Sequence, residues 1–140
     1  MNQTLAIIKP DAVSAGLIGK ILSHLEDSGF IVGDIKMIHM APHQAGKFYE
    51  IHKEQPFYDS LIKFMTSGPA VPILLKSNNA VSRLRQIIGA TDPNEADEGT
   101  IRKLYATSLG ENAVHGSDSD ANAIKEINFF FSSSELILNK

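Results

Sequence analysis

The sequence contains no cysteine, and this absence excludes several kinds of chemistry. Without thiols the chain has no disulfide framework, no cysteine-ligated metal site and no thiol nucleophile. The absence fits a reducing compartment, and we expect a cytoplasmic protein. The sequence also lacks any apolar run near the roughly 18 residues of a membrane-spanning helix. The N-terminus MNQTLAIIKPD has no basic region followed by a long apolar one, so we expect no secretory signal and no membrane partner.

The sequence has no excess of basic residues. Its formal net charge of −3 argues against nucleic acid as the primary partner, because such binding needs a positive surface. The apolar fraction of 43% and the charged fraction of 21% are ordinary for a globular protein. We find no internal repeat, low-complexity tract or linker. We therefore expect residues 1–140 to form a single domain with a substantial core.

Apolar periodicity predicts an alternation of strands and helices along the chain. The predicted strands span residues 3–8, 31–40, 71–76 and 128–131, and the predicted helices span residues 16–28, 42–53, 57–66, 78–88, 100–107 and 119–127. Ser77 or Asn78 is the expected cap of the helix that ends near residue 88. This order favours an α+β fold, a ferredoxin-like sandwich with a four-stranded antiparallel sheet, helices on one face and an inserted long loop. The first and third strands are then central, and we place Pro72 at the irregular first residue of the third strand.

The inserted loop begins at Gly89 and lacks any apolar period up to about residue 110. A stretch of this length inside a compact domain is usually functional or disordered. The three arginines of the sequence all lie around it. Arg85 borders the buried stripe of its helix, whereas Arg83 is placed on the far side as a solvated charge. Arg102 opens a short helix, where a cation is unfavourable unless an anion lies nearby.

Three further side chains have both a structural and a functional interpretation. Lys9 ends the first strand, where a cleft can open, although a lone lysine there is often only solvated. Phe57 follows a proline at a helix start, and it is either a core aromatic or a ring on which a base could stack. Tyr49 is equally open between these two interpretations.

The histidines differ in their local contexts. His24, His39, His43 and His52 lie in helices or in an alternating strand and favour structural interpretations. His115 lies in NAVHGSDS, after a short extended segment and beside a glycine that leaves backbone space next to the ring. A neutral imidazole can act as a nucleophile, a base or a metal ligand. No second ligand stands at helical spacing, so we expect no protein-held metal.

Glu126 follows His115 on the predicted helix over 119–127. If Ile124 and Ile127 face inward, Glu126 lies well off their centre and is interpreted as a surface carboxylate. A nucleophilic imidazole nevertheless needs an acceptor at its other nitrogen, and a carboxylate can serve. The spacing in the sequence does not show that the two side chains meet.

Four segments together resemble the nucleoside diphosphate kinase family nearly from end to end. They are TLAIIKPDAV (4–13), FYEIHKEQPFYDSLIKFMTSGP (48–69), GATDPNEADEGTIR (89–102) and NAVHGSDS (112–119), followed by Glu126 and FFF. The resemblance implies exchange of the γ-phosphate, chiefly of ATP, between nucleoside tri- and diphosphates through a phosphohistidine. It also implies Mg²⁺ that arrives with the nucleotide, and self-association into a dimer-based tetramer or hexamer.

The resemblance assigns roles to particular residues. His115 would be the nucleophile, Glu126 and Ser117 would orient it, and Tyr49 would lie nearby. Phe57 would stack on the base. The residues that would grip the phosphates and the ribose are Lys9, Arg85, Thr91, Arg102 and Asn112.

Two other functions are compatible with the predicted fold class. A non-catalytic regulatory module would bind nucleotide through the same phosphate grip but would lack the nucleophile. An RNA-binding sandwich would show surface aromatics on its central strands and a basic face. The predicted strands show neither feature, and the net charge has the wrong sign.

Overall fold

The structure is a computed structural model, and it describes residues 2–131. Its elements in chain order are β1 (Gln3–Ile8), α1 (Pro10–Ser14), α2 (Ile18–Asp27), β2 (Ile31–Ile35), α3 (Pro42–Phe48), the 3₁₀ turn η1 (Glu50–His52), α4 (Tyr58–Met65), β3 (Val71–Lys76), α5 (Ala80–Ile88), α6 (Ile101–Tyr105), β4 (Val114–Gly116) and α7 (Asp120–Phe130). Two of the predicted strands, residues 3–8 and 71–76, have the bounds that the periodicity indicated.

The four strands form one antiparallel sheet in the order β2-β3-β1-β4. The first and third strands are therefore central, as predicted, and the ferredoxin-like fold class is confirmed. β4 is an edge strand, and its pairing with β1 sets His115 opposite Ile7. Directly opposite residues of an antiparallel pair project to the same face. This register decides which layer of helices His115 meets.

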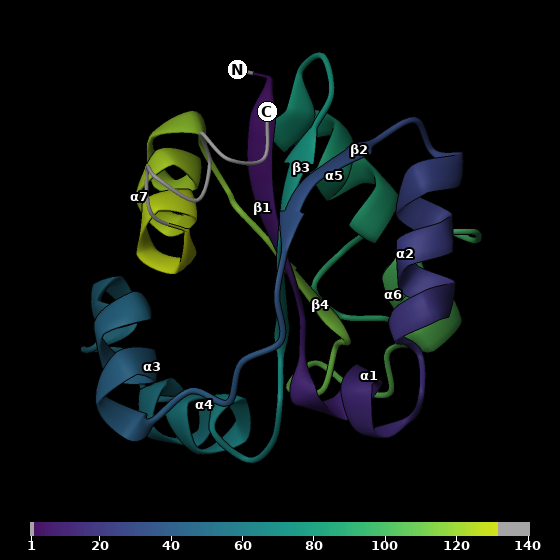
Figure 1. Cartoon of the computed structure of the whole chain (residues 1–140). Helices are drawn as coiled ribbons and strands as arrows, with labels where there is room; N and C mark the ends of the chain where they lie inside the picture. Colours follow the sequence, from purple (N-terminus) through teal and green to yellow (C-terminus); the bar gives the residue numbers. More distant parts are fainter. Residues whose placement is uncertain (1, 132–140) are drawn as a thin grey trace.

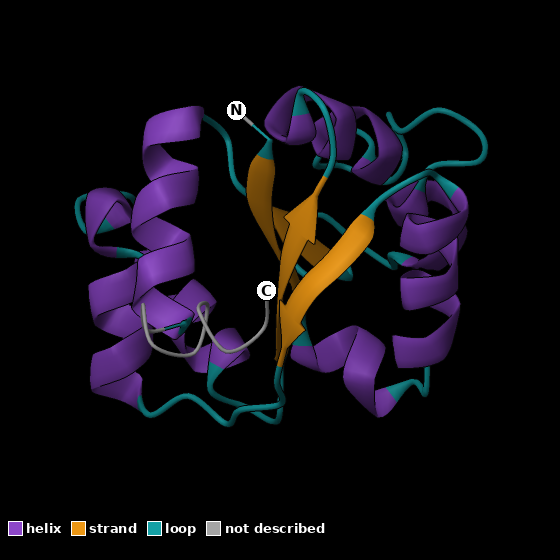
Figure 2. Cartoon of the chain, turned by 45° about the horizontal axis from the view of Figure 1, so that its top comes forward, coloured by secondary structure: helices purple, strands orange, loops and turns teal. Residues whose placement is uncertain are grey.

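The sheet divides two apolar layers because side chains alternate along β1. Leu5 and Ile7 belong to the cluster under α3, α4 and α7, whereas Ala6 and Ile8 belong to the cluster under α2 and α5. Figures 1 and 2 show helices on both sides of the sheet. The expectation of helices on one face thus describes α2 and α5, but it is wrong for α3, α4 and α7, which cover the opposite face.

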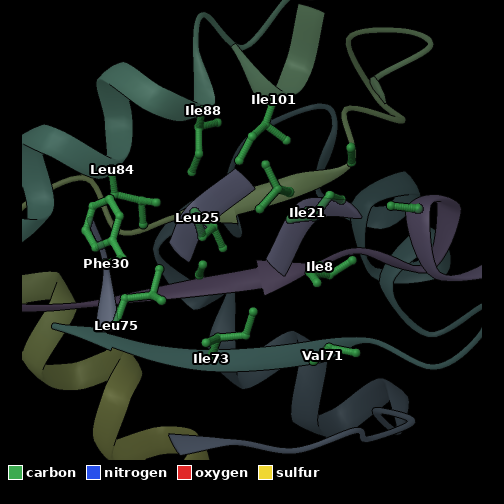
Figure 3. Packing of buried hydrophobic residues seen from close by; sticks show 14 of the residues in the cluster. Ile8, Ile21, Leu25, Phe30, Val71, Ile73, Leu75, Leu84, Ile88 and Ile101 are labelled. Carbon is green, nitrogen blue, oxygen red and sulfur yellow. The ribbon is translucent and has the colours of Figure 1, made fainter. Parts of the chain in front are cut away.

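The layer under α2 and α5 packs strand residues against the buried stripes of the helices. Ile21 and Leu25 of α2 are spaced i, i+4, as are Leu84 and Ile88 of α5, so each pair lies on one side of its helix. Figure 3 shows these side chains pointing toward Ile8 and its neighbours on the sheet. This layer fixes α5, and with it the position from which Arg85 projects.

The predicted strand over 128–131 is wrong. Ala123, Ile127 and Phe130 are buried at i, i+4 and i+7, so α7 continues through this segment to Phe130. The fourth strand is instead β4, which contains His115.

Smaller predictions about strand and helix starts also need correction. β3 begins at Val71, so Pro72 is its second residue. The Pro72 carbonyl accepts from the Lys36 amide at 3.3 Å, just past the end of β2. Pro72 has no amide hydrogen to donate toward β2, but the hydrogen-bonded pairing of β2 with β3 ends at this position, so no bond is lost. The N-cap of α5 is Asn79, in a left-handed conformation and with no side-chain cap, rather than Ser77 or Asn78.

Within residues 2–131, no helix has both the length and the apolar character that a membrane crossing requires.

Candidate active site

The segment that carries His115 is tied to the end of β1 by backbone contacts. The Lys9 amide donates to the Ala113 carbonyl at 2.9 Å, and the Ala113 amide donates to the Asp11 carboxylate at 3.0 Å. Ala113 has a φ of 73°, a region that non-glycine residues rarely adopt and that recurs at functional sites. The Lys-Pro-Asp break after β1 therefore holds the entrance of β4 in an unusual conformation.

His115 is held by a carboxylate from the helix that follows it. Since His115 is paired with Ile7, its ring projects toward the layer of α3 and α7. Its Nε2 lies 2.7 Å from Oε1 of Glu126, and Ser117 Oγ donates to the same oxygen at 2.7 Å. The His115 side chain is 19% exposed. The contact with Glu126 thus occupies Nε2 and leaves Nδ1 as the other ring nitrogen.

Aromatic rings surround the imidazole on the side of α3. The ring centroids of Phe48 and Tyr49 lie 5.6 and 6.4 Å from that of His115, both in edge-on geometry. The Tyr49 hydroxyl is buried and has no hydrogen-bond partner. Burial, with the nearby charge of Glu126, raises the pKa of Tyr49 well above its ordinary value, so this phenol stays protonated.

A buried cation lies at the end of β1. Lys9 Nζ donates to Asn112 Oδ1 at 2.8 Å, and Asn112 Nδ2 donates to the Thr91 carbonyl at 3.3 Å. These two hydrogen bonds connect three predicted site residues: Lys9 after β1, Thr91 in the inserted loop and Asn112 before β4. Burial and the charge of Arg102 lower the pKa of Lys9 to about 8, although Asp11 opposes the shift.

The two arginines next to the inserted loop lie together. Arg102 donates to the carbonyls of Gly89 at 3.0 Å and of Val114 at 2.9 Å, while its Nε is buried without a partner. Burial and the charge of Arg85 lower the pKa of Arg102 to about 10. Arg85 is exposed, and both arginines line a small crevice with Gly89 and Gly116. Two guanidinium groups so close together favour a bound anion.

Asp118 is an acidic neighbour that sequence reasoning missed. It is exposed, and it accepts a hydrogen bond from Asn122 Nδ2 at 2.6 Å. This bond, together with the charges of Arg85 and His115, lowers the pKa of Asp118 although partial burial opposes the shift. Asp118 therefore lies within electrostatic reach of both the histidine and the crevice, and its place in the Ser-Asp run was the available signal.

Phe57 stands apart from the other predicted residues. The residue is 46% exposed just before α4, and its aromatic contact is with His52, at a centroid distance of 5.5 Å. The interpretation as a core aromatic is wrong because nearly half of the residue is open to solvent. An exposed ring at a helix start is available for stacking.

The interpretations of Glu126 from helix periodicity and of Arg83 as a solvated charge need correction. Ile124 is 52% exposed, so the inward stripe of α7 runs through Ala123, Ile127 and Phe130, and Glu126 lies at its edge. Arg83 is not a solvated charge. It donates to the Ser28 carbonyl at 2.6 Å and to Ser77 Oγ, and its guanidinium lies 5.2 Å from the centre of the Phe30 ring. Arg83 therefore fastens α5 to the end of α2, away from the histidine.

Comparison with known proteins connects this geometry to an activity. A sequence model described as "Nucleoside diphosphate kinase" matches residues 2–136. Proteins named nucleoside diphosphate kinase from Chlorobium chlorochromatii and Persephonella marina are 53% and 51% identical over 137 residues, which cover 98% of this chain and 98% of each relative.

Solved structures agree with the sequence comparison. The nucleoside diphosphate kinase of Aquifex aeolicus has a TM-score of 0.94 at 44% identity, covering 96% of this chain and 97% of its own. The halophilic nucleoside diphosphate kinase of Halobacterium salinarum, solved in complex with CDP, has a TM-score of 0.92 at 37% identity, covering 96% and 91%. Similarity of this extent in both sequence and structure shows that the chain belongs to the nucleoside diphosphate kinase family, whose members are phosphotransferases.

Proposed function

We propose that this kinase transfers the γ-phosphate, chiefly of ATP, to nucleoside diphosphates in two steps, through a phosphohistidine at His115. The observation that carries the proposal is the partly exposed imidazole whose Nε2 is held at 2.7 Å by Glu126. A ring held through one nitrogen presents the other in a fixed direction. Such orientation removes much of the entropic barrier to an in-line displacement.

Each step forms one bond and breaks one bond. The Nδ1 lone pair of His115 attacks the γ-phosphorus, and the bond to the bridging oxygen breaks, so the nucleoside diphosphate leaves with that electron pair. A terminal phosphate oxygen of the second nucleoside diphosphate then attacks the same phosphorus, and the P–N bond breaks. The positive charge that develops on the imidazole is stabilised by Glu126, which accepts from Nε2. Ser117 donates to the same oxygen and keeps the carboxylate in place.

Cations and donors of the site bind the phosphates. A phosphoryl transition state spreads negative charge over its oxygens, so catalysis depends on positioned positive groups. We assign this role to Lys9, Arg85 and Arg102, with Asn112 and Thr91 completing the grip on the phosphates and the ribose. The buried Tyr49 hydroxyl, which lacks a partner, has a donor free for a phosphoryl oxygen.

Phe57 supplies the surface on which the base stacks. Stacking uses the face of a base and reads none of its hydrogen-bonding edges, so it tolerates every base. This tolerance suits an enzyme that equilibrates different nucleotides.

The divalent cation of the reaction, for which we propose Mg²⁺, fits a site that the protein does not itself supply. In residues 2–131 no group of three or more histidine and acidic side chains could hold a metal ion, whereas Lys9, Arg85 and Arg102 attract phosphates. Mg²⁺ commonly binds through substrate phosphates, where it neutralises charge during transfer. These residues would hold the ion indirectly, through the nucleotide.

We propose that the protein associates with itself through the exposed edge of the sheet. β2 is an edge strand, and near it the large apolar residues Ile31, Ile35 and Met37 are 65%, 40% and 58% exposed. An exposed apolar edge favours pairing with another chain, and here the partner is a second copy in a dimer-based tetramer or hexamer. We further propose that residues 1–140 act as a single domain in the cytoplasm. Sedimentation should show the assembly, and Ile31→Lys should reduce it.

Labelling with γ-³²P-ATP tests the function. The protein should become labelled with an acid-labile, base-stable bond, and added GDP should remove the label as GTP. His115→Ala should abolish labelling, while His43→Ala, which removes an exposed histidine of α3, should retain it. A protein that binds nucleotide but takes no label would instead be a non-catalytic module. Transfer by His115→Ala at the wild-type rate would show that another residue is the nucleophile.

A further inference from the structure

The hydrogen bond to Glu126 does not by itself fix the tilt of the His115 ring. A single contact at Nε2 fixes that atom, but the ring can still tilt about it and change the direction of Nδ1. A second contact against the imidazole is therefore needed to fix the direction of attack.

Phe48 makes such a contact. It is the last residue of α3, and its ring centroid lies 5.6 Å from that of His115 with an interplanar angle of 70°. This edge-on arrangement is a preferred geometry between aromatic rings. Tyr49 also approaches the imidazole, at 6.4 Å, so Phe48 is the nearer of the two rings.

The Phe48 ring is itself held firmly. Its centroid lies 4.8 Å from that of Tyr49, 5.3 Å from that of Phe129 and 5.0 Å from that of Phe130. These neighbours come from the end of α3 and from α7, the helix that also carries Glu126. The two contacts on the imidazole, from Phe48 and from Glu126, are thus linked through α7.

We propose that Phe48 is a positioning residue, which acts through His115 by fixing the tilt of the imidazole so that Nδ1 faces the incoming phosphorus. This proposal rests on the proposed role of His115 as the nucleophile. Phe48 itself is assigned no contact with the substrate. Because one ring serves both steps, loss of the contact slows phosphorylation by a triphosphate and dephosphorylation by a diphosphate alike.

Rapid-quench measurement of the two half-reactions tests the proposal in the full chain. Phe48→Leu should slow both steps by a similar factor, about 10-fold or more, since small misplacements of a reacting group have large effects on rate. The KM for each nucleotide should stay within about two-fold, because the phosphate-binding residues are unchanged. Phe48→Tyr, which keeps the ring, should restore most of the rate.

Phe129→Leu is the matched control. Phe129 contacts Phe48 and Phe130, and no ring contact joins it to His115 in the described residues. Its loss perturbs the same cluster, while Tyr49 and Phe130 still hold Phe48 against the imidazole. We expect it to lower the melting temperature about as much as Phe48→Leu while leaving both half-reactions near the wild-type rate. If Phe48→Leu does not fold, Phe48→Met replaces it, because methionine fills irregular apolar space without presenting a flat ring.

The outcomes separate this inference from the proposed function. Equal slowing by Phe48→Leu and Phe129→Leu would overturn the positioning role and leave general packing as the cause. Wild-type half-reaction rates in a folded Phe48→Leu would overturn it as well. In either case wild-type protein that is labelled at His115 would leave the nucleophile assignment intact, whereas unlabelled wild-type protein would remove the basis of both.

Discussion

Lys9 combines burial with the positive charge that we assign to phosphate binding. It directly follows the central strand β1, with its ammonium bound to Asn112 and close to Arg102. Burial and this neighbouring cation both disfavour the charged form, and its pKa falls to about 8. A bound phosphate would reverse this penalty, so the free site is electrostatically prepared for an anion.

The lowered pKa of Lys9 predicts a decline of activity in mild alkali. A lysine is charged below its pKa, so the charge is present at pH 7 and is lost as the pH rises through about 8. Since kcat/KM reports groups of the free enzyme, kcat/KM for the nucleoside triphosphate should fall across this range. Lys9→Met should have a lower kcat/KM without that inflection. A wild-type kcat/KM that stays level from pH 7 to well above pH 9 would contradict the assignment.

Glu126 accepts from two donors at one oxygen, and this predicts unequal effects of two substitutions. Glu126→Ala leaves Nε2 of His115 and the Ser117 hydroxyl without their acceptor, and we expect kcat to fall about 10- to 100-fold, as when other partners that orient a reactive group are removed. Ser117→Ala keeps the bond to the imidazole and should cost less. Steady-state kinetics of the two variants provides the measurement. A larger loss of kcat in Ser117→Ala than in Glu126→Ala would contradict the proposal that Glu126 is the main support of the imidazole.

At the scale of elements, the turn between α5 and the inserted loop is a tight junction. Gly89 ends α5 with a φ of 93°, its carbonyl accepts from Arg102, and a Cβ there would lie 2.6 Å from Thr100 Oγ1. Gly99 has a similar φ of 86° but open space around it. Gly89 therefore combines a positive φ with a close approach to Thr100, whereas Gly99 has the positive φ without a close neighbour.

We predict that Gly89→Ala is the more destabilising of the two substitutions. Both substitutions place a side chain at a positive φ, at a cost of roughly 1–3 kcal/mol, and Gly89→Ala adds a clash that brings its total to about 3 kcal/mol or more. Denaturant unfolding gives the two values directly. Gly89→Ala should also weaken nucleotide binding, because it displaces one of the two carbonyls that hold Arg102. Equal destabilisation by Gly89→Ala and Gly99→Ala would mean that the turn relaxes enough to remove the clash with Thr100.

Sequence reasoning located elements well where one periodicity dominated, and it failed where two signals competed. β1 and β3 were predicted to the residue because they are continuous buried runs between clear breaks. Residues 128–131 have the composition of a strand, yet packing of Phe130 against Phe48 extends α7 through them. β4 is three residues long, too short for a period to reveal it.

The candidate site divides in the same way. His115 could be singled out because a glycine and capping residues flank it. Its contact with Glu126 was implied only by the family resemblance and not by the helix periodicity, since choosing Ile124 as an inward residue turned α7 the wrong way. The bond from Lys9 to Asn112 joins residues 103 positions apart, and the role of Asp11 in holding Ala113 is equally remote in sequence. Such contacts depend on the register of β1 with β4.

For the whole molecule, the site joins layers that the sheet otherwise separates. His115 faces the α3 and α7 layer, whereas Gly116 packs against Ile88 and Leu84 of α5 on the other side. A nucleotide that contacts Phe57 before α4, Arg85 of α5 and Arg102 of α6 would bridge helices of both layers. Binding therefore stabilises the fold as a unit rather than one segment of it.

Ligand-dependent unfolding should show this coupling. A nucleoside diphosphate at about 100 times its Kd contributes roughly 2.7 kcal/mol of stability, which corresponds to several degrees in melting temperature. Arg85→Gln removes an exposed side chain, so the melting temperature without ligand should barely change while the ligand-induced shift shrinks. Differential scanning calorimetry measures both. An undiminished shift in this variant would exclude Arg85 from the phosphate grip.

The hydrogen bond from Arg102 to the Val114 carbonyl protects the protein from aggregation. In the pairing of β4 with β1, Val114 faces Ile8 at a position whose backbone groups point away from the partner strand, toward the free side of the sheet. Because the Arg102 guanidinium already donates to this carbonyl, a strand from another molecule cannot pair with it. Replacing Arg102 with leucine would expose this rim, and incubation at high concentration should then yield thioflavin-positive deposits sooner than with the parent protein.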